Sequence, residues 1–166
     1  RSVMASVDEL IVTHISNFRK VKRVDDVVRV FYGIQQQLPA KLIMVGDGPE
    51  REIADQLCKD LGIKKKVLFL GNTSDIDRIL CFTDLFLLPS ESESFGLSAL
   101  EAMAAGVPVV SSNAGGLSEV NEEGVSGYLC PIGDVQTMAE KAIYILSDKD
   151  RLAQFKQNAR KVAARF

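Results

Sequence analysis

Short apolar runs of strand length alternate with segments of helical periodicity along most of this 166-residue chain. Between the runs, apolar residues recur every three to four positions, as in helices with one buried face. The runs themselves are apolar at almost every position, which indicates strands that are covered on both faces. They lie at residues 10–15, 41–45, 67–70, 85–88, 107–110 and 127–129. We therefore expect an α/β fold: a doubly wound, six-stranded parallel sheet with helices on both faces.

Helices are expected near residues 24–38, 49–61, 74–80, 96–106 and 135–146, with a last one ending at the chain end. Pro39 ends the first helix, and Pro49 suits the first position of the second. Gly62 is a candidate C-cap and Ser74 a candidate N-cap. Residues 1–9 are weakly patterned and are interpreted as a linker or boundary, and residues 10–166 as one domain.

Composition excludes several classes of protein. A net charge of −2 without a dominant basic block argues against a nucleic-acid partner. The three cysteines, Cys58, Cys81 and Cys130, are widely spaced without a CxxC pair, which favours free thiols in a reducing cytoplasm over a zinc site. No run approaches the ~18 apolar residues of a membrane span, and no signal-peptide pattern is present. We expect a cytoplasmic protein.

Unusual residues gather in the loops that follow the predicted strands, at 16–23, 46–50, 89–96 and 111–116. In a doubly wound, Rossmann-like sheet these loops share one edge, where ligands bind. The loop at 46–50 fails as a GxGxxG fingerprint because Arg51 takes the third glycine position, and no P-loop motif exists. Gly48 is either a plain turn or a point of close approach to a ligand.

The stretch 88–106 combines a polar loop with a helix that opens at about Gly96. Helical spacing puts Glu101 in one stripe with Leu97, Leu100 and Ala104, which predicts a carboxylate in apolar surroundings that needs a partner. That partner is either a cation of the protein or the hydroxyl groups of a bound ligand. The helix N-terminus suits an anion.

A basic run, Arg19, Lys20, Lys22 and Arg23, follows the first strand. It is either a solvated loop or a cluster that neutralises a phosphate at the same edge. His14, the only histidine, is interpreted as a hydrogen-bonded structural residue rather than a catalytic one. Gly115-Gly116, followed by Glu119, is either a plain tight turn or a part of the binding site at the same edge.

The motifs together resemble a known family. ExFGLxxLEAMAxGxPVV from Glu93, GDGPE at 46–50, FLG at 69–71 and GGxxE at 115–119 are similar to the C-terminal, donor-binding domain of retaining GT-B glycosyltransferases of group 1. The resemblance covers residues 10–160. It implies a nucleotide-sugar donor and no metal ion. It also implies that an N-terminal acceptor domain and a terminal crossover helix are absent here, so that this chain binds UDP or a UDP-sugar without transferring the sugar.

The resemblance also implies roles for residues. The catalytic set is Glu93, at the donor sugar near the reacting carbon, Lys22, at the diphosphate, and Arg19, which partly replaces an arginine found in many members where this chain has Asn17. The donor-binding residues are Glu101, at the ribose hydroxyls, and a group at the sugar, phosphates and nucleobase: Asn17, Gly46, Gly48, Phe69, Leu70, Phe95, Gly96 and Leu97.

A narrower resemblance lies in HISNFRKVKRVDD at 14–26. It points to members that transfer N-acetylglucosamine from UDP-N-acetylglucosamine to a small acceptor such as L-malate. Two alternatives are half of a UDP-sugar epimerase and a non-catalytic nucleotide-binding module. The basic loop and the ExFGLxxLEAMAxG motif argue against the epimerase. A receiver-like module would need an acidic pair after the first strand and an Asp after the third, where this chain has a basic loop and Gly71-Asn72.

Overall fold

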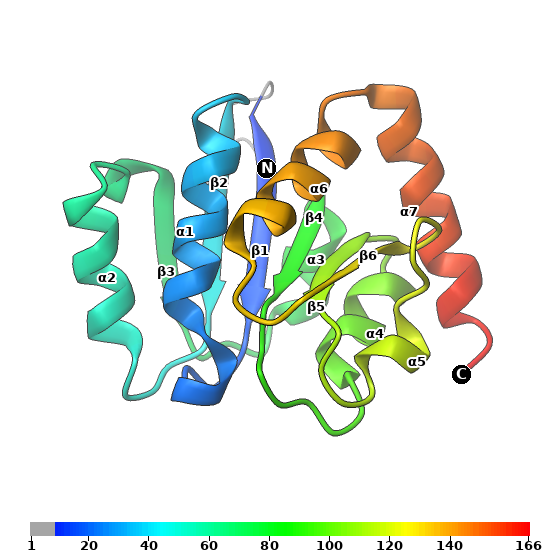
Figure 1. Ribbon diagram of the computed structural model, residues 1–166, viewed down its shortest axis with the longest axis horizontal. Helices are drawn as coiled ribbons and strands as arrows, with labels where there is room; N and C mark the ends of the chain where they lie inside the picture. The colour runs from blue at the N-terminus through cyan, green and yellow to red at the C-terminus, as the bar shows by residue number, and fades with distance from the viewer. Residues whose placement is uncertain (1–8) are drawn as a thin grey trace.

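The fold is built on one fully parallel, six-stranded sheet with the strand order β3-β2-β1-β4-β5-β6 (Figure 1). The computed structural model describes residues 9–166. Its strands are β1 Leu10–Ile15, β2 Ala40–Val45, β3 Val67–Gly71, β4 Leu85–Leu88, β5 Val109–Ser112 and β6 Gly127–Cys130. The doubly wound α/β prediction is confirmed. The linker expected at 1–9 lies outside the described residues except for Glu9, which is buried and bonded to Lys66.

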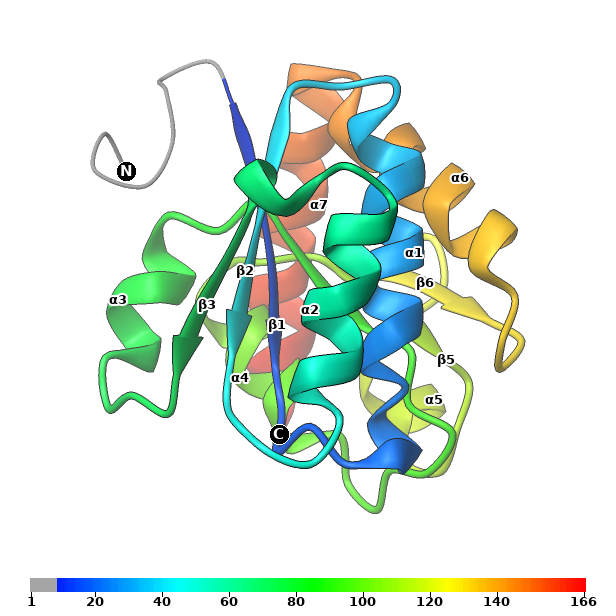
Figure 2. The same ribbon diagram turned by 90° about the vertical axis from the view of Figure 1, so that its left-hand side faces the viewer.

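Helices cover both faces of the sheet (Figure 2). One face carries α1, α2 and α6; the other carries α3 and α4, and α7 packs against α4. The helices are α1 Val24–Gln35, α2 Arg51–Asp60, α3 Ile76–Cys81, α4 Leu97–Ala104, α5 Leu117–Val120, α6 Val135–Leu146 and α7 Lys149–Ala163. Two short 3₁₀ turns, η1 Lys20–Lys22 and η2 Lys64–Lys66, complete the set.

Side-chain alternation explains why the strands are apolar throughout. Val12 and Leu85 pack into the core beneath α1 and α6, whereas Ile11 packs beneath α3 and Phe86 beneath α4. Successive side chains of a strand point to opposite faces, so a strand covered on both faces fills two cores at once.

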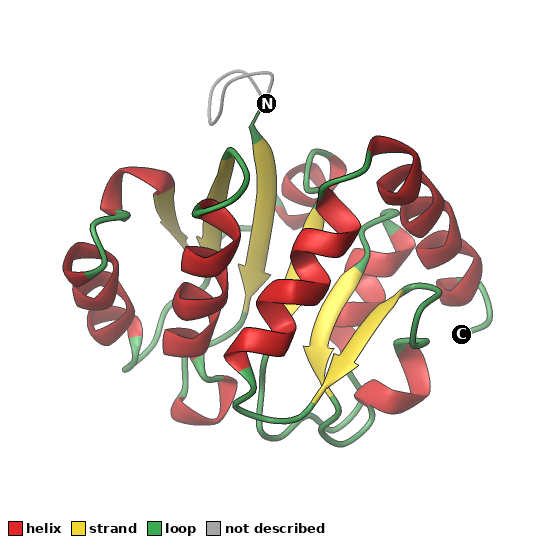
Figure 3. Ribbon diagram, turned by 45° about the horizontal axis from the view of Figure 1, so that its top comes forward, coloured by secondary structure: helices red, strands yellow, loops and turns green. Residues whose placement is uncertain are grey.

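The strand order reverses between β1 and β4. From this point the chain runs outward to β3 on one side and to β6 on the other. All strands end at the same edge of the sheet (Figure 3). Because β1 and β4 are neighbours, the loops that follow them leave the sheet side by side, at the position where such folds bind ligands.

Several predicted boundaries are wrong by a few residues. β5 begins at Val109 rather than 107, because the Val107 N–H still bonds to the carbonyl of Ala102 and Pro108 has no N–H for the ladder. The second helix begins at Arg51, so Pro49 lies before its first position.

Two short features near helices also differ from expectation. The N-cap of α3 is Asp75, whose N–H bonds to Thr73 Oγ1, so the prediction that Ser74 caps this helix is wrong. The four-residue helix α5 was not predicted, because a single turn gives no periodic pattern. Gly62 does take the left-handed conformation of a C-cap residue, with φ of 73°.

The expectation that Glu101 is buried in an apolar stripe is wrong. α4 contacts the core through Ala99, Ala102 and Met103, which are fully buried, whereas Leu97 is 63% exposed and Glu101 is exposed. α4 carries apolar side chains on nearly every side, so periodicity does not identify its inner face. The small alanine side chains let α4 approach β5 and α7 closely. Glu101 therefore needs no partner inside the protein.

Candidate functional site

The loops that follow β1 and β4 are joined by a charged pair and a backbone bond. Lys22 Nζ lies 2.7 Å from Glu93 Oε1, and the Glu91 N–H donates to the carbonyl of Val21 at 2.8 Å. Ser90 Oγ also donates to Glu93 Oε1, at 2.9 Å. The Lys22 side chain is 21% exposed and that of Glu93 10% exposed. The pair is thus held largely out of water, with both bonds on Oε1, which leaves Oε2 to accept from a ligand.

The N-terminus of α4 lies beside this pair. Gly96, with φ of 66°, is the N-cap, and the first turn of α4 carries no acidic residue. The first N–H groups of a helix have no partner within it and carry partial positive charge. Together with Lys22 they make this end of α4 suited to an anion.

A pocket of about 410 Å³ opens between the two loops. It is lined by Ile15, Ser16, Asn17, Lys22, Ser92, Glu93, Ser94, Phe95, Gly96, Leu97 and Ser98. We refer to it as the Lys22 pocket. Its hydroxyl, amide and charged groups suit a polar, phosphorylated ligand.

The Gly115-Gly116 turn supports the loop that carries Glu93. The Gly116 N–H donates to the carbonyl of Glu93 at 3.0 Å. Gly115 has φ of 49°, and a Cβ there would lie 1.7 Å from the same carbonyl oxygen. The turn is therefore tight because the backbone of the Glu93 loop lies directly against it.

The GDGPE loop after β2 supports the loop after β1 in the same way. A Cβ on Gly46 would lie 1.7 Å from the Ser16 carbonyl oxygen, and one on Gly48 would lie 2.0 Å from that of Asn17. The Glu50 N–H donates to the carbonyl of Phe18 at 3.0 Å. Both glycines are thus required by close backbone contact.

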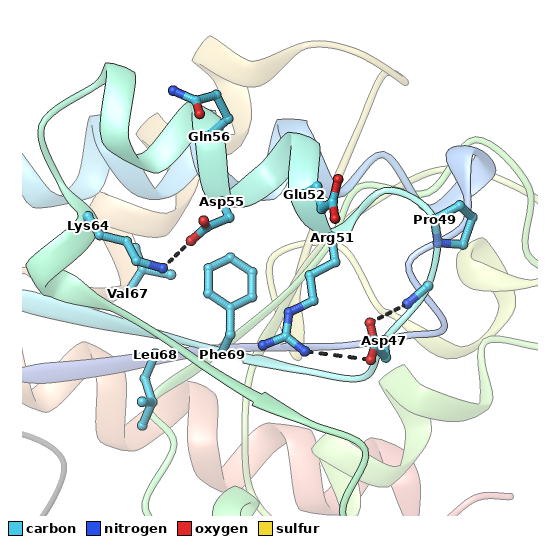
Figure 4. A pocket seen from close by; sticks show the side chains of 11 residues that line it. Asp47, Pro49, Arg51, Glu52, Asp55, Gln56, Lys64, Val67, Leu68 and Phe69 are labelled. Atoms are coloured by element: carbon cyan, nitrogen blue, oxygen red, sulfur yellow. Dashed lines mark hydrogen bonds and ion pairs between the residues drawn. The ribbon is translucent and has the colours of Figure 1, made fainter.

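A second, wider pocket of about 1130 Å³ lies between α2 and β3 (Figure 4). Phe69 lies in it with Lys64 Nζ 4.8 Å and the Arg51 guanidinium 5.5 Å from its ring centroid. Asp55 holds Lys64 through a salt bridge, and Asp47 lies 3.6 Å from Arg51. The wider pocket is adjacent to the Lys22 pocket: Gly48, which lines the wider pocket, lies against Asn17, which lines the Lys22 pocket.

His14 is a buried structural residue, as predicted. Its Nδ1–H donates to the carbonyl of Leu87 and its Nε2 accepts from Ser16 Oγ, both at 2.8 Å. Burial lowers the pKa of His14 from 6.5 to about 4, so the ring is neutral. Because Ser16 lines the Lys22 pocket, His14 fixes part of its wall.

The predicted site residues fall into three groups. Asn17, Lys22, Glu93, Phe95, Gly96 and Leu97 line the Lys22 pocket. Gly48 and Phe69 line the wider pocket. Arg19, Gly46, Leu70 and Glu101 line neither of the two.

The last group has four different surroundings. Arg19 is exposed beside η1, and Gly46 is buried beneath Ser16. Leu70 packs against the small core beneath α3. Glu101 lies one helical turn beyond Leu97 on the exposed face of α4. Their proposed roles at the donor stay predictions.

Sequence reasoning missed part of the lining. Ser16, Ser92, Ser94 and Ser98 line the pocket, and the serine-rich run around Glu93 was the available signal. It also missed the left-handed backbone at Phe18, with φ of 48°, for which the sequence carries no signal.

No group of three or more His, Cys, Asp or Glu side chains is placed to hold a metal ion among residues 9–166. The three cysteines are free thiols, and burial raises the pKa of Cys58 and of Cys130 to about 11. Within the described part of the chain, no helix is long and apolar enough to cross a membrane.

A doubly wound sheet with a lysine, a helix N-terminus and hydroxyl groups at its switch point is the arrangement of a nucleotide-binding domain. The chain belongs to the glycosyl transferases group 1 family, whose sequence model matches residues 2–162. Its six-stranded domain matches the C-terminal domain of the GT-B fold.

Individual relatives agree with this assignment. The chain is 49% identical over 155 residues to the N-acetyl-alpha-D-glucosaminyl L-malate synthase of Bacillus anthracis, covering 93% of this chain and 41% of that protein. It is 38% identical over 140 residues to the D-inositol 3-phosphate glycosyltransferase of Mycobacterium marinum, covering 80% and 29%. This chain thus spans less than half the length of these relatives.

Solved structures give the same result. HepE of Anabaena, solved in complex with UDP, matches with a TM-score of 0.87 and 30% identity, over 95% of this chain and 44% of that one. TarM of S. aureus matches with a TM-score of 0.89 and 27% identity, over 95% and 32%.

Proposed function

We propose that this chain is the donor-binding domain of a retaining glycosyltransferase that moves N-acetylglucosamine from UDP-N-acetylglucosamine to L-malate. The observation that carries the proposal is the Lys22–Glu93 pair beside the N-terminus of α4, in a chain 49% identical to the Bacillus anthracis L-malate synthase. The acceptor would be bound by an N-terminal domain beyond this chain.

The geometry suggests where each part of the donor would lie. The diphosphate would meet Lys22 and the free N–H groups of α4 at Leu97 and Ser98. The sugar would lie over Glu93, whose Oε2 would accept from one of its hydroxyl groups. The nucleoside would run past Gly48 toward the pocket at Phe69, with the ribose hydroxyls within reach of Glu101. HepE, which matches 95% of this chain, was solved in complex with UDP, and this supports UDP as the nucleotide part of the donor.

The chemistry would rest on stabilising the leaving group. When the bond between the sugar and the β-phosphate breaks, UDP gains negative charge, which Lys22 and the α4 dipole would stabilise. The new bond would form on the same face of the sugar, and a phosphate oxygen would take the proton of the acceptor hydroxyl. Glu93 would orient the sugar through Oε2, since Lys22 and Ser90 occupy Oε1. It need not form a covalent bond to the sugar, because the phosphate oxygen serves as the base on the same face.

A two-part experiment tests the proposal. Calorimetric titration of this chain with UDP should show binding, and incubation with UDP-N-acetylglucosamine and L-malate should give no product. The full-length protein should then release UDP only when L-malate is present and give an α-linked glycoside by NMR. The donor assignment fails if the chain does not bind UDP. The substrate assignment fails if the full-length enzyme prefers UDP-glucose or does not use L-malate.

A further inference from the structure

Arg23 connects three loops at the binding edge. Its Nε donates to Asp26 Oδ2 at 2.7 Å, and its Nη1 donates to Glu91 Oε2 at 3.1 Å. Its guanidinium also lies over the loop between β6 and α6, where a Cβ on Gly133 would come within 3.2 Å of Nη2. Arg23 therefore touches the loops after β4 and β6 while belonging to the loop after β1.

Asp26 is the buried anchor of this arrangement. It is 3% exposed, and both of its carboxylate oxygens are bonded to guanidinium groups: Oδ2 to Arg23 and Oδ1 to Arg29 Nη1 at 2.9 Å. It also lies in the first turn of α1, where negative charge is favoured. A buried carboxylate is stable only with such partners, so Asp26 restricts where the Arg23 side chain can lie.

The backbone at Arg23 is unusual as well. Its φ is 52°, in the left-handed region that side-chain-bearing residues rarely adopt. Arg23 is at once the C-cap of the 3₁₀ turn η1 and the N-cap of α1. With this backbone conformation, the Arg23 side chain bonds to Asp26 and Glu91, and the side chain of the preceding Lys22 bonds to Glu93. A strained backbone of this kind persists only when surrounding contacts hold it.

We propose that Asp26 and Arg23 are positioning residues for donor binding: the buried Asp26 fixes Arg23, and Arg23 holds the loops after β1 and β4 at the spacing that places Lys22 beside Glu93. This inference rests on the proposed function, because it assigns Lys22 to the diphosphate. Without the contacts of Arg23 to Asp26 and Glu91, the Lys22 side chain would adopt many positions. The affinity for a diphosphate would then fall, because binding would have to order that side chain again.

The simpler interpretation is that Asp26 only stabilises the start of α1. Asp25 offers a comparison, since it also lies in the first turn and is bonded to Arg29 at 2.6 Å without reaching either pocket loop. If Asp26 only stabilises the helix, removing either of its partners, Arg23 or Arg29, should have similar effects on UDP binding. If Asp26 positions Arg23, only the loss of the Asp26–Arg23 contact should weaken phosphate binding.

Three variants separate these readings. Arg23→Gly keeps the left-handed turn, which glycine adopts freely, and removes the links to Asp26 and Glu91. Asp26→Asn places an NH₂ group against one guanidinium and removes the charge. Arg29→Ala is the matched control, because it removes the other guanidinium from Asp26 and leaves the Arg23 link intact. Each chain is titrated with UDP by calorimetry and with uridine by NMR.

Arg23→Gly and Asp26→Asn should each weaken UDP binding by about fivefold to tenfold with uridine affinity unchanged, and Arg29→Ala should change both by less than about twofold. Thermal denaturation monitors folding, and if Asp26→Asn fails to fold, Arg23→Gly decides alone. Unchanged UDP affinity in Arg23→Gly overturns the positioning role, as does an equal loss for UDP and uridine. If the unmodified chain binds UDP no better than uridine, the fault lies with the proposed function instead.

Discussion

Lys22 Nζ lies 2.7 Å from Glu93 Oε1, so that a salt bridge joins the loops that follow β1 and β4. These two strands are neighbours in the sheet although their ends are separated by 70 residues or more of chain, and the strand order reverses between them. The pair thus marks the switch point of the fold by direct contact. The salt bridge also holds the Lys22 side chain in place before a phosphate binds, so that binding costs less side-chain entropy.

Replacing Lys22 by alanine should weaken UDP binding by about tenfold to a hundredfold, since hydrogen bonds to charged groups contribute about 1.5–3 kcal/mol. Lys20→Ala is the matched control: it removes the same charge from the same 3₁₀ turn, but Lys20 is exposed and does not line the Lys22 pocket. Calorimetry at low salt measures both. Similar losses in the two variants would mean that only overall charge matters.

Glu101→Ala should leave the free energy of unfolding within about 0.5 kcal/mol of the original, because Glu101 is exposed. If Glu101 binds the ribose, the same variant should bind UDP about tenfold more weakly and lose much less for 2′-deoxy-UDP, which lacks one partner hydroxyl. Glu140→Ala, another exposed helical glutamate, serves as control. An equal loss for both nucleotides would exclude a contact with the 2′-hydroxyl.

Stability should fall on mild acidification because of His14, the single histidine of the chain. Its folded pKa of about 4 lies below the unfolded value of 6.5, so the unfolded state binds more protons between these values. The contribution of the neutral ring is complete above pH 6.5 and is lost as pH falls toward 4. By linkage, unfolding should become about 2 kcal/mol easier from pH 7.5 to 5.

Urea denaturation at the two pH values measures this loss. The His14→Asn variant keeps a donor for the carbonyl of Leu87 and does not titrate in this range. Its stability should therefore change far less between pH 7.5 and 5. The same decline in both chains would assign the effect to other groups.

Gly115→Ala should destabilise the chain by more than about 3 kcal/mol, since the new methyl group would collide with the Glu93 carbonyl in addition to the strained φ. Gly62→Ala is the control. Gly62 also has a positive φ, of 73°, but a Cβ there meets nothing within 4 Å, so only the conformational cost of about 1–2 kcal/mol applies. Equal destabilisation would show that the Gly115 turn does not bear on the Glu93 loop.

The sequence was sufficient to predict the α/β class, the six strands and the edge of the sheet at which the candidate site lies. The apolar runs were informative because both faces of this sheet are covered, and parallel strands bring their carboxyl-terminal loops to one edge. The boundary of β5 was misplaced because Val107 and Pro108 are apolar but cannot join the ladder.

The orientation of α4 and the support of the site were beyond the sequence. Periodicity is uninformative in a helix that is apolar all round, so Glu101 was assigned to the wrong face. The Asp26–Arg23–Glu91 chain of contacts depends on the left-handed backbone at Arg23 and on a partner 68 residues away. Tertiary contacts decide both features, and neither has a local pattern.

The most direct test of the account is a crystal structure of this chain with UDP-N-acetylglucosamine. We predict that the diphosphate lies within hydrogen-bond distance of Lys22 Nζ and of the N–H groups at the start of α4, with the sugar against Glu93. A diphosphate bound elsewhere, for example by Lys64 and Arg51 in the pocket at Phe69, would contradict it.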